Sequence, residues 1–549
     1  MNSGIVPPFT EDRHGNSGHI LIGVQRRSLL FLVTILAMVI PGFNEGVAFS
    51  NEFILVHTND FHGRYYPIEV TSDNVTAQTG GSGEGGAGLT RTGRAGGFAC
   101  QATLLRQLRE ARGDENVFAV HAGDTFSDDL LGNLTKGEAV IRLMNVLGYD
   151  FLALGNHDFD YGWDRTREQA ALADFPMLAA NVTLRETGEP VFGQPWRVVT
   201  LGGVKVGFLA LGYHNTGHTT NPENITSLSF SNGIDATRRY LPELREQSDV
   251  VVVVSHQGMA VDRKLAREVK GIDIILSGHS HNWTEPPEKI RDTWLVEAFS
   301  NGVLVDELRV RMNDKRVADV EQTLHVLWND QCQPAPDVSA MIDKLREPHR
   351  QQLEAVVGTA GEDIGRQYKT ASPFDQLVGE ILRQETGADV ALLPGVGYGV
   401  TLRAGPITRE TLYTLLPHPS KLVTLELSGA QIRKILEESA TNQKPADPLA
   451  MVGGLIQTSG MGWTVDYQRP SESRITDVTV NGKPLAPDAL YRVATHSGML
   501  AGIHRYTTFA QGRNLRRSDR LLTHIVEEHL QRRGSVFAPA AVDDILIKN

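Results

Sequence analysis

Between residue 51 and about residue 325, short β-branched apolar runs alternate with helical patterns, and this alternation limits the fold more strongly than any other property of the chain. Apolar runs of this length are typical of buried strands, and strands that alternate with helices indicate an α/β layered domain. We interpret six runs as strands: Phe53–His57, Val117–His121, Phe151–Leu154, Lys205–Leu211, Val250–Ser255 and Ile272–Ser277. The helical patterns between them include Ala99–Arg112 and Glu138–Leu147.

Polar side chains follow five of these strands at the point where each strand ends. The segments are Asp60-Phe61-His62, Gly123-Asp124, Gly155-Asn156-His157-Asp158, Ser255-His256 and Gly278-His279-Ser280-His281. In open α/β sheets, sites form at the carboxyl ends of the strands, so these side chains can converge although they lie far apart in the sequence. One such histidine alone would more often be structural, but five segments in series indicate a site.

The residue types in these segments are those of a metal centre. Imidazole, carboxylate and amide oxygen suit zinc, manganese, iron or cobalt, and none of the segments contains cysteine. A carboxylate can bridge two ions, and two ions roughly 3.5–4 Å apart can clamp a phosphate ester for attack by a metal-bound hydroxide. The sequence therefore predicts two divalent metal ions, zinc or manganese, and hydrolysis of phosphate esters.

The same segments resemble a known family. The stretches that begin at His57, Ala122 and Gly155, together with the two later histidine segments, are similar to the calcineurin-like metallophosphoesterase signature. From residue 51 to about residue 515 the chain resembles the 5′-nucleotidase family of periplasmic and cell-surface enzymes. The resemblance implies an N-terminal four-layer metallophosphoesterase fold, in which a β-sandwich is flanked by helices. A helical linker and a mixed α/β substrate-binding domain would follow.

The resemblance also implies roles for individual residues. One ion would be held by Asp60, His62 and His281, the other by Asn156, His256 and His279, with Asp124 bridging both. His157 would bind the phosphoryl group and Asp160 would orient it. A carboxylate bonded to an imidazole favours the protonated ring, which stabilises developing phosphate charge. For Asp158 we expect a structural role, in which it caps the segment that follows it.

The chain divides into four predicted regions. These are an export segment over residues 1–50, the metallophosphoesterase domain over 51–326, a linker with a helix over 327–355 and the C-terminal domain over 356–549. The glycine-rich stretch Gly80–Gly97 is typical of a flexible connecting loop. It is less typical of a phosphate-binding loop, since no lysine follows it in the P-loop spacing. In the C-terminal domain we expect helices near Phe374–Thr386 and Ser428–Ala440, and strands near Val390–Leu393, Lys421–Leu427 and Arg492–Thr495.

The C-terminal domain resembles the family less closely than the N-terminal domain does. Gly399 stands where the family has an arginine that binds phosphate, and Arg403 is the nearby candidate to replace it. Leu455 and Tyr506 stand where the family stacks the base between two rings, so one stacking residue is lost and one is retained. The segment Pro394–Gly399 also resembles the related thiosulfohydrolase of sulfur oxidation. The intact Gly155–Asp158 segment favours phosphate-ester chemistry.

The start of the chain has the order of a secretory signal. Arg26-Arg27 precede an apolar run, Leu29–Ile40, and the small residues Gly46 and Ala48 follow. The run is short for a membrane span, so we expect cleavage after Ala48 or Ser50, with an uncleaved anchor as the alternative. The arginine pair also fits twin-arginine export. We therefore expect a periplasmic or extracellular protein.

Composition limits the partners. The net charge of −12 gives no attraction to nucleic-acid polymers or anionic membranes, so a phosphate would be bound by local charge. We expect a small phosphate ester as the partner and no stable membrane partner beyond the export segment. The two cysteines, Cys100 and Cys332, are compatible with one disulfide, but we favour two unpaired structural thiols.

These features predict an exported two-metal phosphohydrolase. Its substrates would be nucleoside 5′-monophosphates or related small phosphate esters, UDP-sugars among them. Two alternatives stay open. One is a hydrolase of sulfur esters related to the thiosulfohydrolase. The other is an exported binding protein without catalysis, against which the full set of metal ligands argues.

Overall fold

The computed structural model describes residues 51–71, 89, 91–366, 370–396, 400–540 and 545–548. The predicted export segment and Gly399 lie outside these residues, as does most of the predicted Gly80–Gly97 loop. Within the described part of the chain, no helix combines the length and the apolar character that a membrane span requires.

The N-terminal domain contains two six-stranded sheets. In the first, β1, β4 and β5 pair in parallel, and β15 pairs antiparallel with β1. The order is β16 (Arg316–Val326), β15 (Leu304–Asn313), β1 (Glu52–Thr58), β4 (Val117–His121), β5 (Phe151–Ala153) and β6 (Met177–Leu178). The second has the order β13 (Glu288–Ile290), β14 (Thr293–Glu297), β12 (Ile274–Ser277), β11 (Val250–Ser255), β9 (Val204–Leu211) and β8 (Trp196–Leu201).

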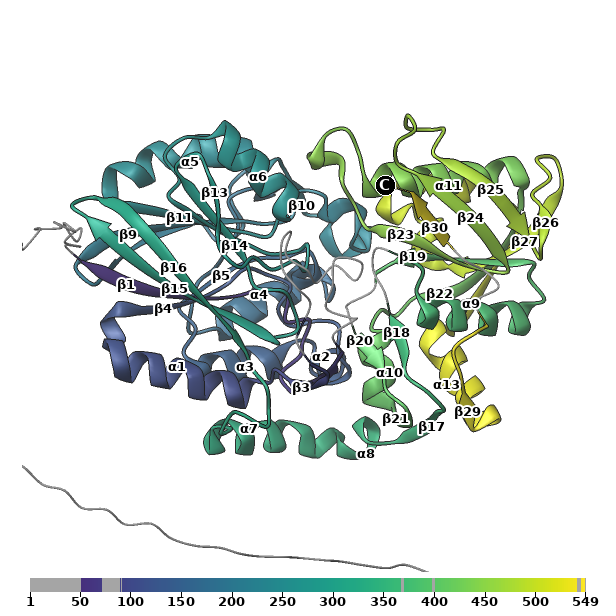
Figure 1. Ribbon diagram of the computed structural model, residues 1–549, viewed down its shortest axis with the longest axis horizontal. Coiled ribbons are helices and arrows are strands. Elements are labelled where there is room, and N and C mark those ends of the chain that lie inside the picture. The colour runs from purple at the N-terminus through teal and green to yellow at the C-terminus, as the bar shows by residue number, and fades with distance from the viewer. Residues whose placement is uncertain are drawn as a thin grey trace, which may run out of the picture. The chain divides into compact units, whose positions relative to one another are not determined.

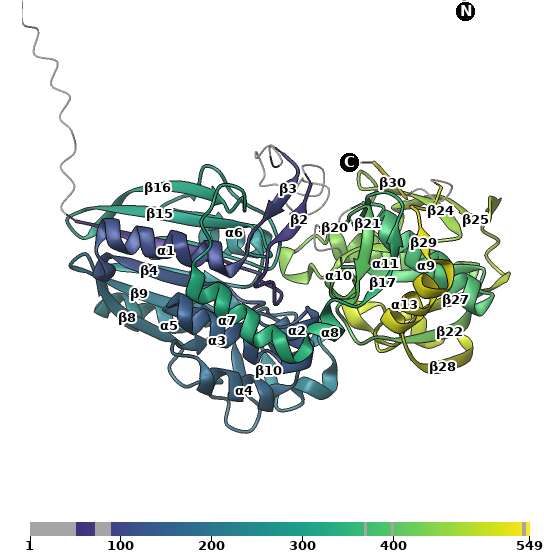
Figure 2. The same cartoon turned by 90° about the horizontal axis from the view of Figure 1, so that it is seen from below.

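The two sheets pack face to face and helices cover their outer faces. Buried side chains of both sheets, such as Leu55, Val120, Phe208 and Val252, form one core cluster between them. Helices α1 (Phe98–Arg112) and α3 (Glu138–Leu147) pack on one outer face, and α5 (Gly233–Gln247) and α6 (Met259–Glu268) cover the other (Figures 1 and 2). The predicted four-layer arrangement is confirmed.

The expected strands and helices of this domain form within one or two residues of their predicted bounds. Part of the predicted glycine-rich loop is regular, however. Gly93–Ala95 forms β3, which pairs antiparallel with β2 (Ile68–Val70). Its three residues are too few for a periodicity to register in the sequence. The linker is helical, as expected: α7 (Pro336–Arg346) lies against α1 and α3 and is followed by α8 (Arg350–Leu353).

The preference for two unpaired thiols is wrong. Cys100 on α1 and Cys332, after the last strand of the domain, form a disulfide across Cα atoms 5.8 Å apart. The sequence could not predict this pair, because the two residues are 232 positions apart and only the fold brings them together. The bond fastens the start of the linker to the N-terminal domain.

The C-terminal domain is built on a five-stranded sheet packed against helices. The sheet has the order β23 (Gly454–Ser459), β19 (Val390–Gly395), β27 (Leu490–His496), β22 (Lys421–Ser428) and β28 (Arg513–Leu521). Helices α9 (Pro373–Thr386) and α11 (Gly429–Gln443) pack against it. Ser428 and Gln431 form a capping box at the start of α11. The described strands and helices include all those predicted for this domain, and the mixed α/β class is confirmed.

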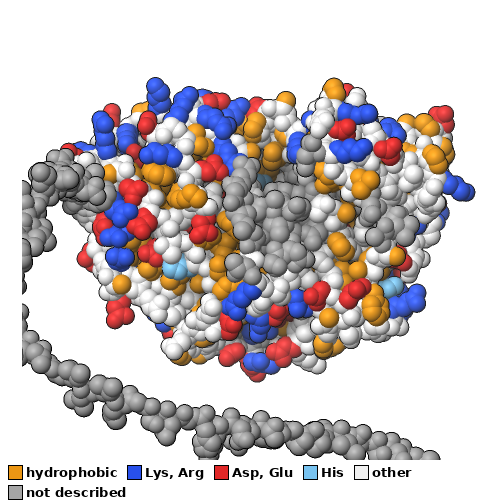
Figure 3. Space-filling view, in the orientation of Figure 1, with side chains coloured by type: hydrophobic (Ala, Val, Ile, Leu, Met, Phe, Trp, Pro, Cys, Tyr) orange, Lys and Arg blue, Asp and Glu red, His pale blue; other side chains and the backbone are white. Residues whose placement is uncertain are grey.

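The two domains share apolar and polar contacts. One core cluster contains side chains of both, among them Ile68 and Leu304 from the N-terminal domain and Leu402 and Ile407 from the C-terminal domain. The fully buried Arg64 donates to the carbonyl of Thr414 at 3.0 Å. On the face drawn in Figure 3, acidic and basic side chains are interspersed.

Candidate active site

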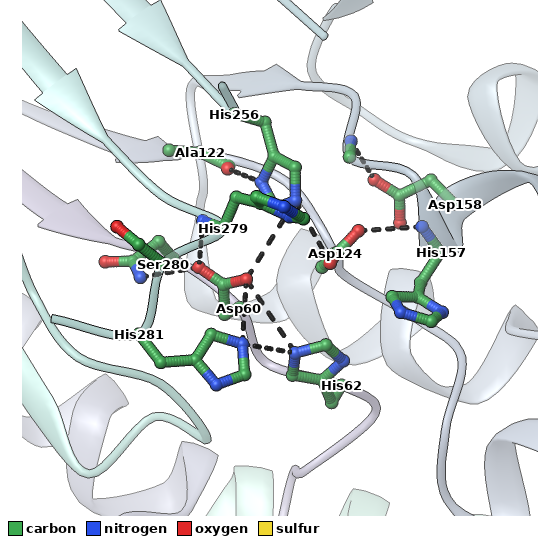
Figure 4. A network of polar contacts seen from close by, with 12 residues as sticks. Asp60, His62, Ala122, Asp124, His157, Asp158, His256, His279, Ser280 and His281 are labelled. Atoms are coloured by element: carbon green, nitrogen blue, oxygen red, sulfur yellow. Dashed lines mark hydrogen bonds and ion pairs between the residues drawn. The ribbon is translucent and has the colours of Figure 1, made fainter. Parts of the chain in front are cut away.

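The polar segments predicted to converge do so, and they come from both sheets of the sandwich. Loops after β1, β4 and β5 bring residues from the first sheet, and loops after β11 and β12 bring residues from the second. Figure 4 shows their side chains facing one another across the seam. The convergence at the carboxyl ends of strands follows the prediction, except that two sheets supply the residues.

The first group of ligand atoms surrounds Oδ1 of Asp60. Nε2 of His281 lies 3.2 Å from this oxygen, and Nε2 of His62 lies 3.7 Å from it. The two Nε2 atoms are themselves 3.0 Å apart. Two imidazole nitrogens and a carboxylate oxygen that face one point in a buried position form a donor set for a metal ion.

The second group consists of Asp124, His256 and His279. Nδ1 of His256 donates to the carbonyl of Ala122 at 2.6 Å, which leaves Nε2 facing Oδ2 of Asp124 at 3.0 Å. A hydrogen bond from the second ring nitrogen is the usual way to fix the orientation of a metal-binding histidine. Oδ1 of Asn156 is buried and has no hydrogen-bond partner among the described residues, which fits a metal ligand.

Asp124 lies between the two groups. Besides His256 and His279, its carboxylate also approaches His62 of the first group, with ligand atoms within 4.8 Å of one another. The residues present therefore fit divalent metal ions, and Asp124 lies within reach of both ligand groups. The donor types are nitrogen and oxygen only, a set that suits zinc and manganese.

Electrostatics keep the carboxylates of this cluster ionised. Burial raises the pKa of Asp60, but His281 and His256 outweigh burial and hold that pKa below its ordinary value. His256 and His157 lower the pKa of Asp124 in the same way, against burial. Burial lowers the pKa of His256, but Asp124 and Asp60 raise it to about 9. Asp60 and Asp124 are therefore anions, the form that binds a metal ion.

The backbone at the site is strained. Asp60, His62, Asp124, His279 and His281 all have φ between +48° and +78°. Non-glycine residues rarely adopt this left-handed region, and strained residues cluster at functional sites. Five of the seven predicted ligands share this conformation.

Gly155 allows two loops to approach each other. A Cβ atom built on it would lie 2.1 Å from Oδ1 of Asp124 and 2.2 Å from the Asp124 nitrogen. No side chain fits there. The glycine before Asn156 in the sequence is therefore required by the packing of the β4 and β5 loops.

The predicted dyad is formed. Nδ1 of His157 lies 2.7 Å from Oδ2 of Asp160, and the His157 amide donates to Oδ1 of Asp124 at 2.8 Å. Burial lowers the pKa of His157, but Asp128, Asp160 and Asp124 outweigh it and raise the pKa well above its ordinary value. A cationic imidazole is therefore fixed beside the two ligand groups.

The capping role expected for Asp158 is wrong. Its carboxylate accepts from the amides of Gly155 and Thr125, both at 2.8 Å. The helix that follows, α4 (Trp163–Leu172), has no side-chain cap. Asp158 instead joins the loop after β5 to the loop after β4, which supports Asn156 and Asp124. The contact with Thr125 depends on the fold and is invisible in the sequence.

Comparison with known proteins agrees with this geometry. The family model of the calcineurin-like phosphoesterase matches residues 54–283, and that of the 5′-nucleotidase C-terminal domain matches residues 355–511. The chain belongs to the 5′-nucleotidase family. As a member of this family it is a metal-dependent phosphoric-ester hydrolase, which confirms the predicted class of enzyme.

Individual relatives of this 5′-nucleotidase-family chain cover nearly its whole length. The 5′-nucleotidase of Bos taurus is 26% identical over 499 residues, which are 82% of this chain and 83% of the relative. The structure of a 5′-nucleotidase precursor from Thermus thermophilus has a TM-score of 0.79 and 25% identity, and covers 91% of this chain and 99% of its own. The structure of a sulfate thiohydrolase from Thermus thermophilus has a TM-score of 0.81 and 24% identity, over 90% of this chain and 96% of its own.

A cavity of about 810 Å³ opens beside the site of this family member. Its N-terminal-domain wall includes His62, Asp124, Asn156, His157, His279 and His281. Its C-terminal-domain wall includes His418, Lys421, His496, His504 and Arg517. Among the described residues of the C-terminal wall, the only aromatic rings are imidazoles.

The substrate-binding residues expected from the family do not line this cavity. Leu455 and Tyr506 are buried in the apolar core around α11 and β22, and neither presents a face to a ligand. Arg403 forms an ion pair with Asp363 at 2.9 Å and is likewise absent from the cavity wall. The resemblance is loose in these segments. An alignment error of a few residues is enough to assign a substrate-binding position to a residue of the apolar core in place of one in the cavity wall.

Two other side chains at the cavity were not predicted. Asp128 is buried, and its carboxylate contacts His62, His157 and His418. His418 lies between two prolines, in the loop from α10 (Arg409–Leu415) to β22. The only sequence signals were a second carboxylate four residues after Asp124 and the Pro-His-Pro segment itself.

Proposed function

We propose that the chain hydrolyses small phosphate monoesters, nucleoside 5′-monophosphates among them, with the help of two divalent ions. The observation that carries this proposal is the pair of ligand groups that share Asp124 and open onto the cavity. Asp60, His62 and His281 would hold one ion; His256, His279 and Asn156 would hold the other. When bound, two such ions neutralise the phosphate oxygens and activate a water molecule for in-line attack on phosphorus.

The protein's own contribution is the placement of charge beside the phosphoryl group. With Nδ1 of His157 bonded to Asp160, the other ring nitrogen is left to donate a hydrogen bond to a phosphoryl oxygen. The amide bond from His157 to Asp124 ties the dyad to the shared carboxylate. A preorganised cation at this position stabilises the charge that develops in the transition state without reorganisation of solvent.

The C-terminal wall would select the leaving group. Its cations are Lys421, Arg517 and Arg366, the last of which pairs with Asp375, and its rings are the imidazoles of His418, His496 and His504. Base stacking on an aromatic side chain stabilises a nucleotide by about 1–3 kcal/mol, and the described part of this wall has no such ring outside the imidazoles. We therefore propose broad selectivity for small polar esters and weak selectivity for the base.

A second candidate is the hydrolysis of a sulfur ester. The observation that favours it is again the C-terminal wall, because Leu455 and Tyr506 are buried where a nucleotide clamp would need them exposed. The phosphate proposal ranks first because the dyad of His157 and Asp160 is complete.

We also propose that the protein acts outside the cytoplasm. The disulfide between Cys100 and Cys332 supports this location, because structural disulfides persist in oxidising compartments and are rare in the cytosol. Detection of the protein in a periplasmic or culture fraction, shortened at its N-terminus, would test the proposal. Retention of the full-length chain in the membrane fraction would favour the anchor instead.

The deciding experiment is a turnover assay of residues 51–549 loaded with Mn²⁺ or Zn²⁺. Its substrates are AMP, UDP-glucose, a generic aryl phosphate and a protein cysteine S-thiosulfonate. We expect hydrolysis of AMP and the aryl phosphate at similar rates. Hydrolysis of the S-thiosulfonate with none of the phosphate esters would overturn the first candidate in favour of the second. No turnover of any substrate by metal-loaded protein would leave the binding-protein alternative.

A further inference from the structure

The buried carboxylate of Asp128 contacts three imidazoles from three parts of the chain. Its Oδ2 atom lies 2.9 Å from Nδ1 of His62 and 3.3 Å from Nδ1 of His157. Its Oδ1 atom lies 3.3 Å from Nε2 of His418. One side chain thus touches a proposed metal ligand, the proposed catalytic histidine and the C-terminal domain.

The backbone of Asp128 is an unusual position for an aspartate. Its φ of +78° lies in the left-handed region, which glycine adopts freely and other residues rarely do. An aspartate also costs free energy when it is buried unless partners compensate it. Strain and burial at one residue are sustained where the surrounding contacts require that side chain.

His418 reaches the site from a loop that is held at both ends. Before His418, Asn133 of the N-terminal domain donates to the carbonyl of Pro417 at 3.2 Å, and after it the Leu522 amide donates to the carbonyl of Ser420 at 2.9 Å. The prolines on both sides restrict the backbone of His418. Its ring centroid lies 5.3 Å from that of His157, at an interplanar angle of 30°.

Two consequences follow from the shared carboxylate. A carboxylate that accepts from the outer nitrogen of a metal-binding histidine fixes the orientation of that ring. The same carboxylate also lies 3.3 Å from Nδ1 of His157, the atom that Asp160 contacts at 2.7 Å, so two carboxylates restrain the ring of the dyad. The orientations of His62 and His157 are therefore linked through Asp128, and His418 is the group that holds Asp128 from the other domain.

We propose that Asp128 and His418 are positioning residues that align His62 and His157 for the hydrolysis proposed above, so that the dyad is fully ordered only when the C-terminal domain is seated. This inference rests on the proposed function for its catalytic readout. Neither residue is assigned to contact the reacting atoms. Their effect is expected on kcat, with little effect on KM for a small aryl phosphate.

The test compares the parent chain with Asp128→Asn, His418→Gln and the double variant, using kcat and KM for an aryl phosphate. Removal of such outer partners lowers activity by about 10–100-fold, which we expect for Asp128→Asn, and we expect roughly threefold to tenfold for His418→Gln. The double variant should match Asp128→Asn alone, because the two residues act through one contact. His325→Gln is the matched control, since it breaks an imidazole–carboxylate contact with Glu307 that is remote from the cavity.

A second readout does not depend on activity. In metal-free, histidine-labelled protein, the ring resonances of His157 and His62 should shift in His418→Gln and stay in place in His325→Gln. If the parent chain hydrolyses no phosphate ester, the proposed function fails. These resonances still test whether His418 orients His157 and His62 through Asp128.

Three outcomes would overturn the proposal that Asp128 and His418 are positioning residues. The first is a kcat of His418→Gln within about twofold of the parent together with unshifted rings. The second is a double variant whose loss equals the product of the single losses, which means that the residues act independently. The third is a loss of one bound ion in His418→Gln by elemental analysis, which would assign Asp128, His157, Asp160 and His418 to a further metal site.

Discussion

The role of His157 is a matter of single atoms. Its ring is held by Asp160 at 2.7 Å, and its pKa is raised well above the ordinary value because Asp128, Asp160 and Asp124 outweigh burial. We expect His157→Ala to lower kcat by about 10²–10³-fold, since it removes a charge placed for the transition state. The bound metal should be unchanged, because His157 belongs to neither proposed ligand group. Turnover within a few-fold of the parent would contradict the assignment.

Gly155 shows how little space the site leaves. In Gly155→Ala the new methyl group would lie 2.1 Å from Oδ1 of Asp124, so the loops after β4 and β5 must separate. We expect loss of at least one of the two ions, measured by elemental analysis after dialysis. Gly217→Ala is the matched control, because a Cβ atom there meets nothing within 4 Å. Full metal content in Gly155→Ala would contradict the requirement for glycine at this position.

His496, on the C-terminal wall, makes stability depend on pH. Burial, and then repulsion from His418, His504 and Arg366, lowers its pKa to about 3, whereas the unfolded chain has about 6.5. The folded state excludes a proton that the unfolded state binds, so its stabilisation is complete above pH 6.5 and is lost as pH falls toward 3. At pH 5 the loss is roughly 2 kcal/mol.

His496→Asn should remove this pH dependence. Asparagine retains an acceptor for the Gly498 amide, to which His496 now offers Nδ1. The free energy of unfolding is measured in urea at pH 7 and at pH 5 for both proteins. The decrease from pH 7 to pH 5 should be about 2 kcal/mol smaller in the variant than in the parent. Equal losses would mean that His496 titrates normally in the folded protein.

At the scale of secondary-structure elements, the disulfide between Cys100 on α1 and Cys332 holds the linker to the N-terminal domain. Closing a loop of 232 positions restricts the unfolded chain strongly. The double variant Cys100→Ser, Cys332→Ser should lose about 2–5 kcal/mol of stability, visible as a lower Tm. The parent in reducing buffer should show the same lowered Tm as the double variant. If the Tm is unchanged in both, the disulfide does not stabilise the fold.

The elements that were predictable are those whose signal is local. β11 is a run of five valines before Ser255, and such runs are buried strands wherever they occur in an α/β pattern. The proposed ligands follow strands directly, so their convergence could be predicted from their order alone. Asp128 and His418 could not, because their contact joins positions about 290 residues apart through the placement of two domains. The placement of Leu455 and Tyr506 at the base-stacking positions could not be predicted reliably, because a loose resemblance does not distinguish a residue in the wall of a cavity from one in the core behind it.

At the scale of the whole molecule, the seating of the C-terminal domain depends on buried contacts near Arg64. Its guanidinium is fully buried and donates to the Thr414 carbonyl at 3.0 Å, next to the hydrogen bond between Tyr66 and the Thr414 hydroxyl. By contrast, Lys264 and Asp447 form an exposed pair between the same domains at 2.9 Å. Surface ion pairs contribute at most about 1 kcal/mol, while loss of a buried polar partner costs about 1–3 kcal/mol.

Arg64→Ala should therefore separate domain seating from metal binding. We expect its free energy of unfolding to fall by about 1–3 kcal/mol or more, faster proteolysis between the domains, and a lower kcat through the contact of His418 with Asp128. The ligand groups of the N-terminal domain should retain their ions. Lys264→Ala is the control and should resemble the parent in all three measurements. Equal effects of both substitutions, or loss of metal in Arg64→Ala, would mean that the interface does not act on the dyad in the way the Asp128–His418 contact requires.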